Sequence, residues 1–360
     1  MEAQAVRQQD QVRVLVADDS PTVRLMICRM LESDPGIKVI GTVGNGREAT
    51  EQVALLKPDI VTMDVEMPVM NGLDAIEHIM AYNPVPILVV SSVVDKLHTA
   101  NAARALGAGA VDVMPKPTPA TMQEFEAVAE ELRHKIKLLS KVRVITHPKA
   151  RLSYCPVPAP EKKEQKSETL NAFRLVAIGS STGGPQALQR ILSNMPADVN
   201  AAILIVQHIA KGFTEGLVEW LGASCALDVC SGTNGMAIEP GKVIIAPEGR
   251  HMAVNGNGQV RLVDYEYPGP HKPAANVLLD SVAEHYGSRS IGVILTGMGS
   301  DGALGIRAIH DRGGHTIAQD SETSAIFSMA KEAIKMGGVD EVLPLPDITD
   351  AIVRYLYRKI

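Results

Sequence analysis

The sequence predicts an α/β protein of two domains joined by a linker, and three observations support this prediction. The chain has 360 residues, which is more than a single hydrophobic core usually contains. In both halves, short apolar runs alternate with segments of helical period, as in a parallel sheet wound with helices. Between them, residues 141–171 contain prolines, a cluster of charges and little periodicity, which is typical of a linker. We therefore expect domains over residues 12–140 and 172–360.

The composition excludes several classes of protein. Residues are 46% hydrophobic but only 3% aromatic, so the core must be aliphatic, as in buried parallel sheets. A net charge of −6 indicates neither a nucleic-acid partner nor an anionic membrane surface. No apolar run approaches the roughly 20 residues of a membrane span, so no membrane insertion is expected. The polar start MEAQAVRQQD and four cysteines without a CxxC pair favour a cytoplasmic location.

Five β-α units in a row predict that the first domain is a doubly wound (βα)5 sheet. In its first helical segment, Val23, Met26, Ile27, Met30 and Leu31 have the spacing of one helix face. The expected strands are VRVLVA, IKVIGTV, DIVTMD, PILVVSS and AVDVM, and the expected helices are Pro21–Ser33, Gly46–Leu56, Gly72–Tyr82, Asp95–Leu106 and Thr121–Leu139.

The second domain is also expected to contain a parallel sheet with helices between most of its strands. The expected strands are RLVAIG, AAILIVQ, KVIIAP, SIGVILTG, HTIAQD and VDEVLPL. HMAVNGNGQVRLV differs, because an Asn-Gly pair between two alternating runs is typical of a β-hairpin.

Polar residues gather at four strand ends of the first domain. Asp18 and Asp19 end the first strand, Asp64 ends the third, Ser91 ends the fourth, and Lys116 follows the fifth. Carboxyl ends of parallel strands meet at one edge of a sheet, where ligands bind. A single Asp at such a place is usually a turn residue, but four strand ends together indicate a site. Clustered carboxylates suit Mg²⁺, and a carboxylate can itself accept a phosphoryl group.

These motifs, VLVADDSPTVR, DIVTMDVEMPVMNGLDA and VMPKP, resemble the receiver domain of two-component response regulators. The resemblance implies that Asp64 accepts the phosphoryl group and that Asp18, Asp19 and Asp64 bind Mg²⁺. It also implies that the hydroxyl of Ser91 moves onto the acyl phosphate and that Lys116 is the accompanying cation.

The stretch VAIGSSTGGP in the second domain allows several interpretations. It fits neither GxGxxG nor a P-loop, so a phosphate-binding loop is disfavoured. It fits GxSxG as Gly179, Ser181 and Gly183, between a strand and a helix, which is the setting of a nucleophile elbow. This spacing favours Ser181 over Ser180. GxSxG alone is a weak signal, and a helix N-cap is an equally good interpretation.

A serine nucleophile needs a base, and the base needs a group that orients it. His208 ends the next strand in ILIVQHIAKGF, and Asp301 lies in a glycine-rich loop after a later strand, in GVILTGMGSDGA. The glycines of this loop permit close backbone approach, so N–H groups near Met298 could face an oxyanion. The remaining histidines, among them His251, His271 and His315, are better explained as surface or structural residues.

Five spaced motifs of this domain resemble the catalytic domain of chemotaxis protein-glutamate methylesterases (CheB-type). They are AIGSSTGGPQAL, IVQHIAKGFT, VIIAPEGRHM, LTGMGSDGALG and AQDSETSAIFSM. The resemblance implies that Ser181 is the nucleophile, His208 the general base and Asp301 its orienting group. Thr182 and the backbone of Met298 are implied as oxyanion and substrate contacts.

This resemblance, together with the order of receiver, linker and esterase, implies a function. The enzyme would hydrolyse glutamate γ-methyl esters on chemoreceptor helices, release methanol, and deamidate receptor glutamines, under control of phosphorylation. The implied partners are methyl-accepting chemoreceptors and a CheA-type histidine kinase as phospho-donor. Mg²⁺ would serve the receiver, the esterase reaction would need no cofactor, and a monomer is expected. The alternatives are a non-catalytic adapter that uses the esterase fold, and a nucleotide-binding output domain.

Several positions depart from the usual motifs of these families. Val113 occupies the position of the receiver's aromatic switch residue, and Ile209-Ala210 replaces the Met-Pro that often follows the histidine. FSMA (Phe327–Ala330) replaces FGMP, and HKPAANV carries alanines where serine and an acidic or polar residue are common. We expect the changes in the second domain to affect substrate preference.

Overall fold

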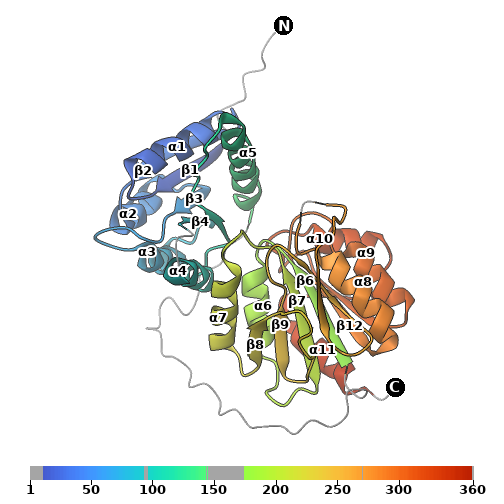
Figure 1. Ribbon diagram of the computed structural model, residues 1–360. Coiled ribbons are helices and arrows are strands. Elements are labelled where there is room, and N and C mark those ends of the chain that lie inside the picture. The colour runs from blue at the N-terminus through green and yellow to red at the C-terminus, as the bar shows by residue number, and fades with distance from the viewer. Residues whose placement is uncertain (1–10, 93–95, 143, 145–173, 270, 359–360) are drawn as a thin grey trace. The chain divides into compact units, whose positions relative to one another are not determined.

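The computed structural model describes residues 11–92, 96–142, 144, 174–269 and 271–358. The chain divides into two compact units, Met1–Pro156 and Val157–Ile360, each built around its own sheet (Figure 1). Most of the expected linker, residues 141–171, lies outside the described residues. The expected domain bounds of 12–140 and 172–360 therefore stay predictions.

The first unit contains the expected five-stranded parallel sheet, with strand order β2-β1-β3-β4-β5. Its strands are β1 (Val12–Ala17), β2 (Ile37–Val43), β3 (Ile60–Met63), β4 (Ile87–Ser91) and β5 (Asp112–Pro115). Its helices are α1 (Pro21–Glu32), α2 (Gly46–Leu56), α3 (Gly72–Tyr82), α4 (Lys96–Gly107) and α5 (Met122–Leu139). α1 packs beside α5, and α3 packs beside α2 and α4, so helices cover both faces of the sheet.

The helix bounds follow from capping residues. Ser20, Asn45, Asn71 and Thr121 each accept a hydrogen bond from a backbone N–H in the first turn of the helix that follows. α5 therefore begins at Met122, one residue after the expected start, because Thr121 is its cap. Asp95, the expected start of the fourth helix, lies outside the described residues.

The second unit contains a seven-stranded parallel sheet with strand order β14-β13-β12-β6-β7-β9-β8. The six expected strands are present as β6 (Arg174–Ser180), β7 (Ala201–Gln207), β9 (Lys242–Ile245), β12 (Ser290–Ile294), β13 (His315–Gln319) and β14 (Glu341–Leu343). The seventh strand, β8 (Asp228–Ser231), was not predicted from the sequence. It lies at the edge of the sheet and has no fully buried residue, so DVCS lacks a strong apolar pattern.

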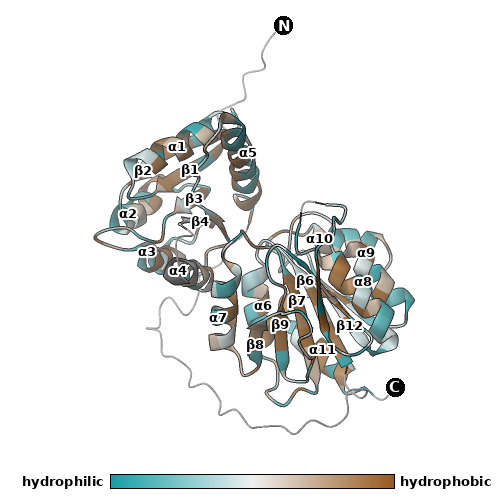
Figure 2. Cartoon of the chain, viewed as in Figure 1, coloured by the Kyte–Doolittle hydropathy of each residue, from teal (hydrophilic) through white to brown (hydrophobic). Residues whose placement is uncertain are grey.

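Helices cover both faces of this sheet. They are α6 (Gly184–Ser193), α7 (Thr214–Ser224), α8 (Ala275–Tyr286), α9 (Ala303–Asp311), α10 (Met329–Lys335) and α11 (Leu345–Leu356). Leu175 and Ala177 of β6 pack with α8, α9 and α10, whereas Val176 and Ile178 pack with α6, α7 and α11. Alternate residues of one strand thus enter opposite cores. Figure 2 shows the resulting concentration of hydrophobic residues on the central strands.

The predicted β-hairpin is confirmed. β10 (His251–Val254) and β11 (Val260–Val263) pair antiparallel, and β10 packs against α8. The side chain of Asn255 accepts hydrogen bonds from the N–H groups of Asn257 and Gln259, which stabilises the turn. Among the helices of the described residues, none is both long enough and apolar enough to cross a membrane.

Candidate functional sites

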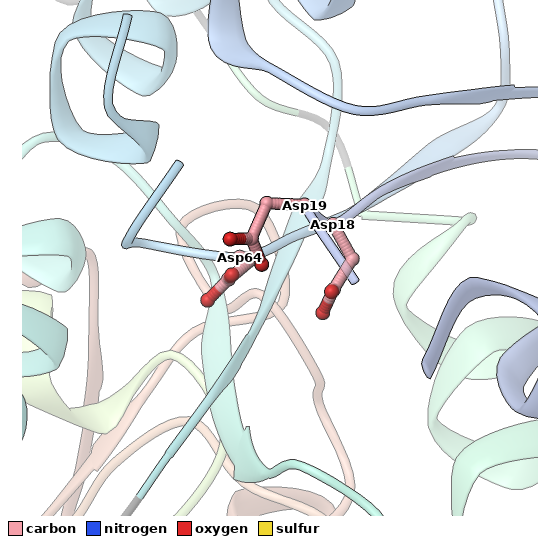
Figure 3. Close-up of side chains that lie close together, drawn as sticks. All are labelled: Asp18, Asp19 and Asp64. Carbon is pink, nitrogen blue, oxygen red and sulfur yellow. The ribbon is translucent and has the colours of Figure 1, made fainter. Parts of the chain in front are cut away.

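The structure brings the three predicted carboxylates of the first unit together. Asp18 and Asp64 directly follow β1 and β3, whose last residues are paired in register. The Asp64 N–H also donates to the Ala17 carbonyl at 2.9 Å. One carboxylate oxygen from each of Asp18, Asp19 and Asp64 lies within 4.8 Å of the other two (Figure 3). The parallel arrangement of the strands therefore accounts for the cluster.

The predicted lysine lies within this cluster. Nζ of Lys116 is 2.7 Å from Oδ2 of Asp64, 3.0 Å from Oδ2 of Asp18 and 3.9 Å from Oδ1 of Asp19. Ser91 is buried at the end of β4, and its carbonyl accepts from the Lys116 N–H. A cavity of about 220 Å³ opens at this sheet edge and is lined by Asp19, Asp64, Glu66, Ser91, Ser92 and Lys116.

The cluster holds more negative charge than Lys116 can balance. Burial, reinforced by Asp18 and opposed by Lys116, raises the pKa of Asp64 to about 6. Oδ2 of Asp18 is also buried, and beyond its ion pair with Lys116 it accepts no hydrogen bond from the described residues. Three carboxylates around an open cavity fit a hard divalent cation such as Mg²⁺, which prefers carboxylate, water and phosphate oxygens.

Ser181 lies on a tight turn between β6 and α6. Its carbonyl accepts from the Gly184 N–H at 2.7 Å, and its N–H donates to the Thr296 carbonyl at 3.1 Å. Gly183 has φ +76°, and a Cβ added there would come within 2.6 Å of Cβ of Ala325, so only glycine fits. The N-cap of α6 is Gly183 itself, with no side-chain hydrogen bond. The alternative that a serine or threonine caps this helix is therefore wrong.

His208 and Asp301 meet beside this turn. β6 and β7 pair up to Ser180 and Gln207, and the His208 N–H donates to the Ser180 carbonyl at 2.9 Å. Nε2 of His208 lies 2.9 Å from Oδ2 of Asp301. Nδ1 of His208 is buried and has no hydrogen-bond partner among the described residues. This ring nitrogen is thus available to a hydroxyl from the adjacent strand end.

The first turn of α8 holds the carboxylate of Asp301. Oδ2 accepts from the Ala275 N–H at 2.6 Å, and Oδ1 accepts from the Asn276 N–H at 2.9 Å. Burial raises the pKa of Asp301, but the hydrogen bonds from His208, Asn276 and Ala275 outweigh it, so the net pKa is lowered. Asp301 therefore stays ionised beside the imidazole at neutral pH.

The loop that contains Met298 passes against Ser181. A Cβ added to Gly297 would lie 2.7 Å from Cβ of Ser181, so glycine is required for this approach. Thr182 is buried, and its carbonyl accepts from Oγ1 of Thr296 at 3.0 Å. Both residues predicted as oxyanion and substrate contacts thus belong to segments next to the serine.

Sequence reasoning did not single out Gln207, the last residue of β7. Its buried amide donates to the Ser181 carbonyl at 2.8 Å and to the His208 carbonyl at 2.7 Å. Its Oε1 accepts from Oγ of Ser180 at 2.7 Å. Gln207 therefore ties the turn to the strand end that carries the histidine. The sequence feature that could have indicated Gln207 is its position as a polar residue at the end of an otherwise apolar strand.

His271, which was expected to be a surface or structural residue, is half-buried and contacts His208. Its ring stacks on that of His208 with centroids 3.9 Å apart and an angle of 12°. Nothing local in the sequence indicated this contact. His251 does have a structural role, because its buried Nδ1 accepts from the Ala274 N–H at 3.1 Å.

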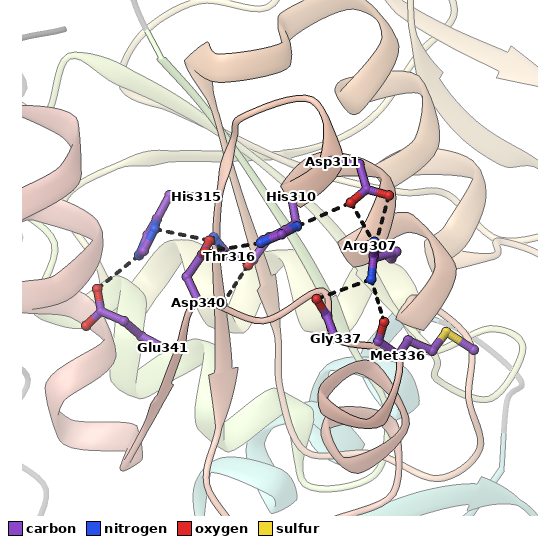
Figure 4. Close-up of polar contacts among 9 residues, drawn as sticks. All are labelled: Arg307, His310, Asp311, His315, Thr316, Met336, Gly337, Asp340 and Glu341. Carbon is purple, nitrogen blue, oxygen red and sulfur yellow. Dashed lines mark hydrogen bonds and ion pairs between the residues drawn. The ribbon is translucent and has the colours of Figure 1, made fainter.

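His315 also belongs to a structural network, at the opposite edge of the sheet. It begins β13, and its Nε2 lies 3.0 Å from Oε1 of Glu341 (Figure 4). Asp340 accepts from the N–H and the hydroxyl of Thr316, both at 2.8 Å. These bonds join β13 to the segment that leads into β14.

The fold and the two sites define a class of protein, a response regulator whose output unit is an α/β enzyme. Residues 14–127 match the response regulator receiver domain family, and residues 176–352 match the CheB methylesterase family. Similar curated proteins span nearly the full chain and are named protein-glutamate methylesterase/protein-glutamine glutaminase. One from Geobacter metallireducens is 41% identical over 97% of this chain and 100% of its own length.

Two further relatives carry the same name. The protein from Anaeromyxobacter dehalogenans is 40% identical over 95% of this chain and 96% of its own length. The protein from Archaeoglobus fulgidus is 40% identical over 97% of this chain and 99% of its own length. The chain therefore belongs to the family of CheB-type protein-glutamate methylesterases that carry a receiver domain.

Proposed function

We propose that the protein is a phosphorylation-controlled esterase that hydrolyses glutamate γ-methyl esters on chemoreceptors and deamidates receptor glutamines. The single observation that supports this best is the 2.9 Å contact between His208 and Asp301 beside the turn that carries Ser181. A hydroxyl, an imidazole and a carboxylate in this order are what acyl transfer through a serine needs. The names of the relatives supply the substrate class.

The proposed reaction has two halves. Oγ of Ser181 attacks the γ-carbonyl carbon while Nδ1 of His208 takes the hydroxyl proton. The tetrahedral oxyanion faces backbone N–H groups near Met298 and Thr182. When the C–O bond breaks, His208 gives its proton to the leaving methoxide, and methanol departs. Water then attacks the acyl carbon while His208 takes one of its protons. When the bond between this carbon and Oγ of Ser181 breaks, His208 returns the proton to Oγ, and glutamate and free Ser181 result.

The same residues account for deamidation of glutamine. The γ-amide carbonyl is attacked in the same way, and His208 protonates the leaving nitrogen so that ammonia departs. Asp301 accepts the Nε2–H of His208, which fixes the tautomer that leaves Nδ1 free as a base. Gln207 holds the backbone of Ser181 and His208, and thereby supports their relative position.

For the receiver unit, we propose that Asp64 accepts a phosphoryl group from a CheA-type histidine kinase. Asp18, Asp19 and Asp64 would hold Mg²⁺, which supplies positive charge for the phosphoryl oxygens. Lys116 contacts the carboxylates that would surround the phosphate, and Ser91 lines the same cavity. Phosphorylation would relieve inhibition of the esterase by the receiver, so the charge added at Asp64 would act as a switch. We propose that the protein is a monomer in the cytoplasm and that it acts on chemoreceptor helices.

The proposal is tested by methanol release from a panel of methylated receptors. We expect release by the wild-type chain and at least about a 1000-fold lower rate with Ser181→Ala, since residual catalysis without the nucleophile is small. Ser180→Ala distinguishes the two serines: it loses the hydrogen bond to Gln207, but it keeps the proposed nucleophile and should retain far more activity than Ser181→Ala. Absence of release by the wild-type chain from any receptor would favour the non-catalytic adapter.

A further inference from the structure

Two neighbouring helices of the second unit begin without a capping side chain of their own. α8 follows the N-cap Ala274, and α9 follows the N-cap Gly302, and neither residue makes a side-chain hydrogen bond. The first N–H groups of a helix have no partner within the helix and must be satisfied from elsewhere. Ala275, Asn276 and Ala303 in these first turns are buried, so their backbone groups need partners within the protein.

Each helix instead receives its cap from the other segment. Asp301, which immediately precedes Gly302, accepts from the N–H groups of Ala275 and Asn276 at 2.6 and 2.9 Å. In return, Oδ1 of Asn276 accepts from the N–H groups of Gly302 and Gly305, both at 3.0 Å. The two helix starts are thus locked together by reciprocal hydrogen bonds.

The residues around these reciprocal hydrogen bonds are closely packed. Asn276 is only 7% exposed, so its carboxamide has little contact with solvent. A Cβ added to Gly305 would come within 2.4 Å of Cβ of Leu279. Gly302 has φ +94°, and a Cβ there would lie 2.7 Å from Cδ1 of Ile294. The backbone beside Asp301 is therefore held between α8 and the sheet.

We propose that Asn276 is a positioning residue of the esterase, which acts through Asp301 and does not touch the substrate. Its carboxamide fixes the start of α9, and with it the preceding Asp301, so that Oδ2 stays 2.9 Å from Nε2 of His208. This inference rests on the proposed function, because it assigns Asn276 to the triad of that reaction.

Removal of the carboxamide should move Asp301. Without Oδ1 of Asn276, the buried N–H groups of Gly302 and Gly305 lose their acceptor, and the first turn of α9 must shift to find another. Asp301 directly precedes Gly302, the N-cap of α9, so a shift of this turn also moves the carboxylate of Asp301 away from His208. A displacement of about 1 Å in a catalytic arrangement can reduce the rate about 100-fold.

The test compares Asn276→Ala and Asn276→Asp in the full chain by methanol release from a methylated receptor. We expect Asn276→Ala to lower kcat about 100-fold with little change in KM, because the substrate contacts remain. Asn276→Asp keeps an oxygen acceptor for both glycine N–H groups and should restore most of kcat. In proton NMR spectra, the downfield signal of the His208 Nε2–H should disappear in Asn276→Ala and persist in Asn276→Asp.

Thr316→Val is the matched control, because Thr316 is also buried and hydrogen-bonded but lies at the opposite edge of the sheet. It should lower the melting temperature without changing kcat or the NMR signal. If Asn276→Ala behaves like this control, Asn276 is structural only and the inference is overturned. If the wild-type chain releases no methanol, the proposed function fails, whereas the NMR comparison still decides whether Asn276 positions Asp301.

Discussion

At the scale of single residues, the proposed chemistry of this protein depends on polar side chains at strand ends, most of them buried. The three carboxylates around Lys116 follow strands of one sheet, and Ser181 and His208 follow strands of the other. Their types and positions could be predicted from sequence, because a polar residue after an apolar run is locally visible. Gln207 was missed because its role depends on contacts with residues 26 or more positions away along the chain.

Replacement of Gln207 should affect both stability and catalysis. In Gln207→Leu, the hydroxyl of Ser180 and the carbonyl of His208 lose their partner, and each buried unpaired group costs about 1–3 kcal/mol. The carbonyl of Ser181 loses one of its two donors and keeps the Gly184 N–H. We expect a loss of about 3 kcal/mol in the free energy of unfolding and a lower kcat. Urea denaturation measures the free energy of unfolding, and methanol release measures kcat. Gln259→Leu, on the exposed hairpin, is the control, and equal behaviour of the two variants would refute this role.

The buried Asp64 should make the stability of the metal-free protein fall as pH rises. Its pKa is raised from 3.8 to about 6 by burial, so between these values the native state binds more protons than the unfolded state. Stability is thus highest below about pH 4 for this group and declines through pH 6, by an amount on the order of 3 kcal/mol.

Asp64→Asn should remove this decline, as measured by denaturation in EDTA from pH 4 to 8. Addition of Mg²⁺ to the wild-type chain should also reduce it, because a bound cation favours the ionised carboxylate. A decline of the same size in Asp64→Asn would assign the effect to other groups.

At the scale of elements, the turn that carries the proposed nucleophile depends on the join between β6 and α6. The GxSxG spacing predicted a turn between a strand and a helix, and the structure has one. The spacing could not decide between an elbow and an ordinary capped helix, since both use small polar residues. The structure shows that the N-cap of α6 is Gly183, and that Ala325 and Thr296 leave no room for a side chain there.

Gly183→Ala should therefore reduce both stability and activity. Gly235→Ala is a matched control, because Gly235 has nearly the same φ, +82°, but no atom within 4 Å of an added Cβ. Both variants bear the backbone cost of about 1 kcal/mol for an alanine at positive φ. Only Gly183→Ala should lose further stability and lower kcat, as thermal unfolding and methanol release would show. Similar results for both would mean that backbone strain alone matters.

At the scale of the whole molecule, two units with separate cores are joined in one chain. Family membership pairs a receiver with a methylesterase, and the proposed control requires the receiver to inhibit the esterase until Asp64 is phosphorylated. If a regulatory unit inhibits an enzyme, removal of that unit must raise the basal rate of the enzyme.

Deletion of residues 1–140 should accordingly increase basal methanol release, and a small-molecule phospho-donor with Mg²⁺ should increase release by the full chain. Asp64→Ala in the full chain is the control and should not respond to the donor. Circular dichroism would confirm that the shortened chain is folded. Unchanged or lower activity in a folded fragment would contradict inhibition by the receiver.

The sequence by itself determined the alternation of strands and helices, the hairpin, and the residues that follow the strands. These features are local, because apolar periodicity and turn residues act over a few positions. Since parallel strands align their carboxyl ends, the order of strands along the chain was enough to predict that Asp18, Asp64 and Lys116 lie close together. The edge strand β8 escaped prediction because an exposed edge needs little apolar pattern.

Only the tertiary structure decided how the proposed catalytic groups are held. Asp301 lies 93 residues from His208 and 25 or 26 from the N–H groups of α8 that bind its carboxylate. The stacking of His271 on His208 and the reciprocal caps of Asn276 and Asp301 likewise join segments remote in sequence. Such contacts arise when helices pack on a shared sheet and buried polar groups must find partners, which no local pattern specifies.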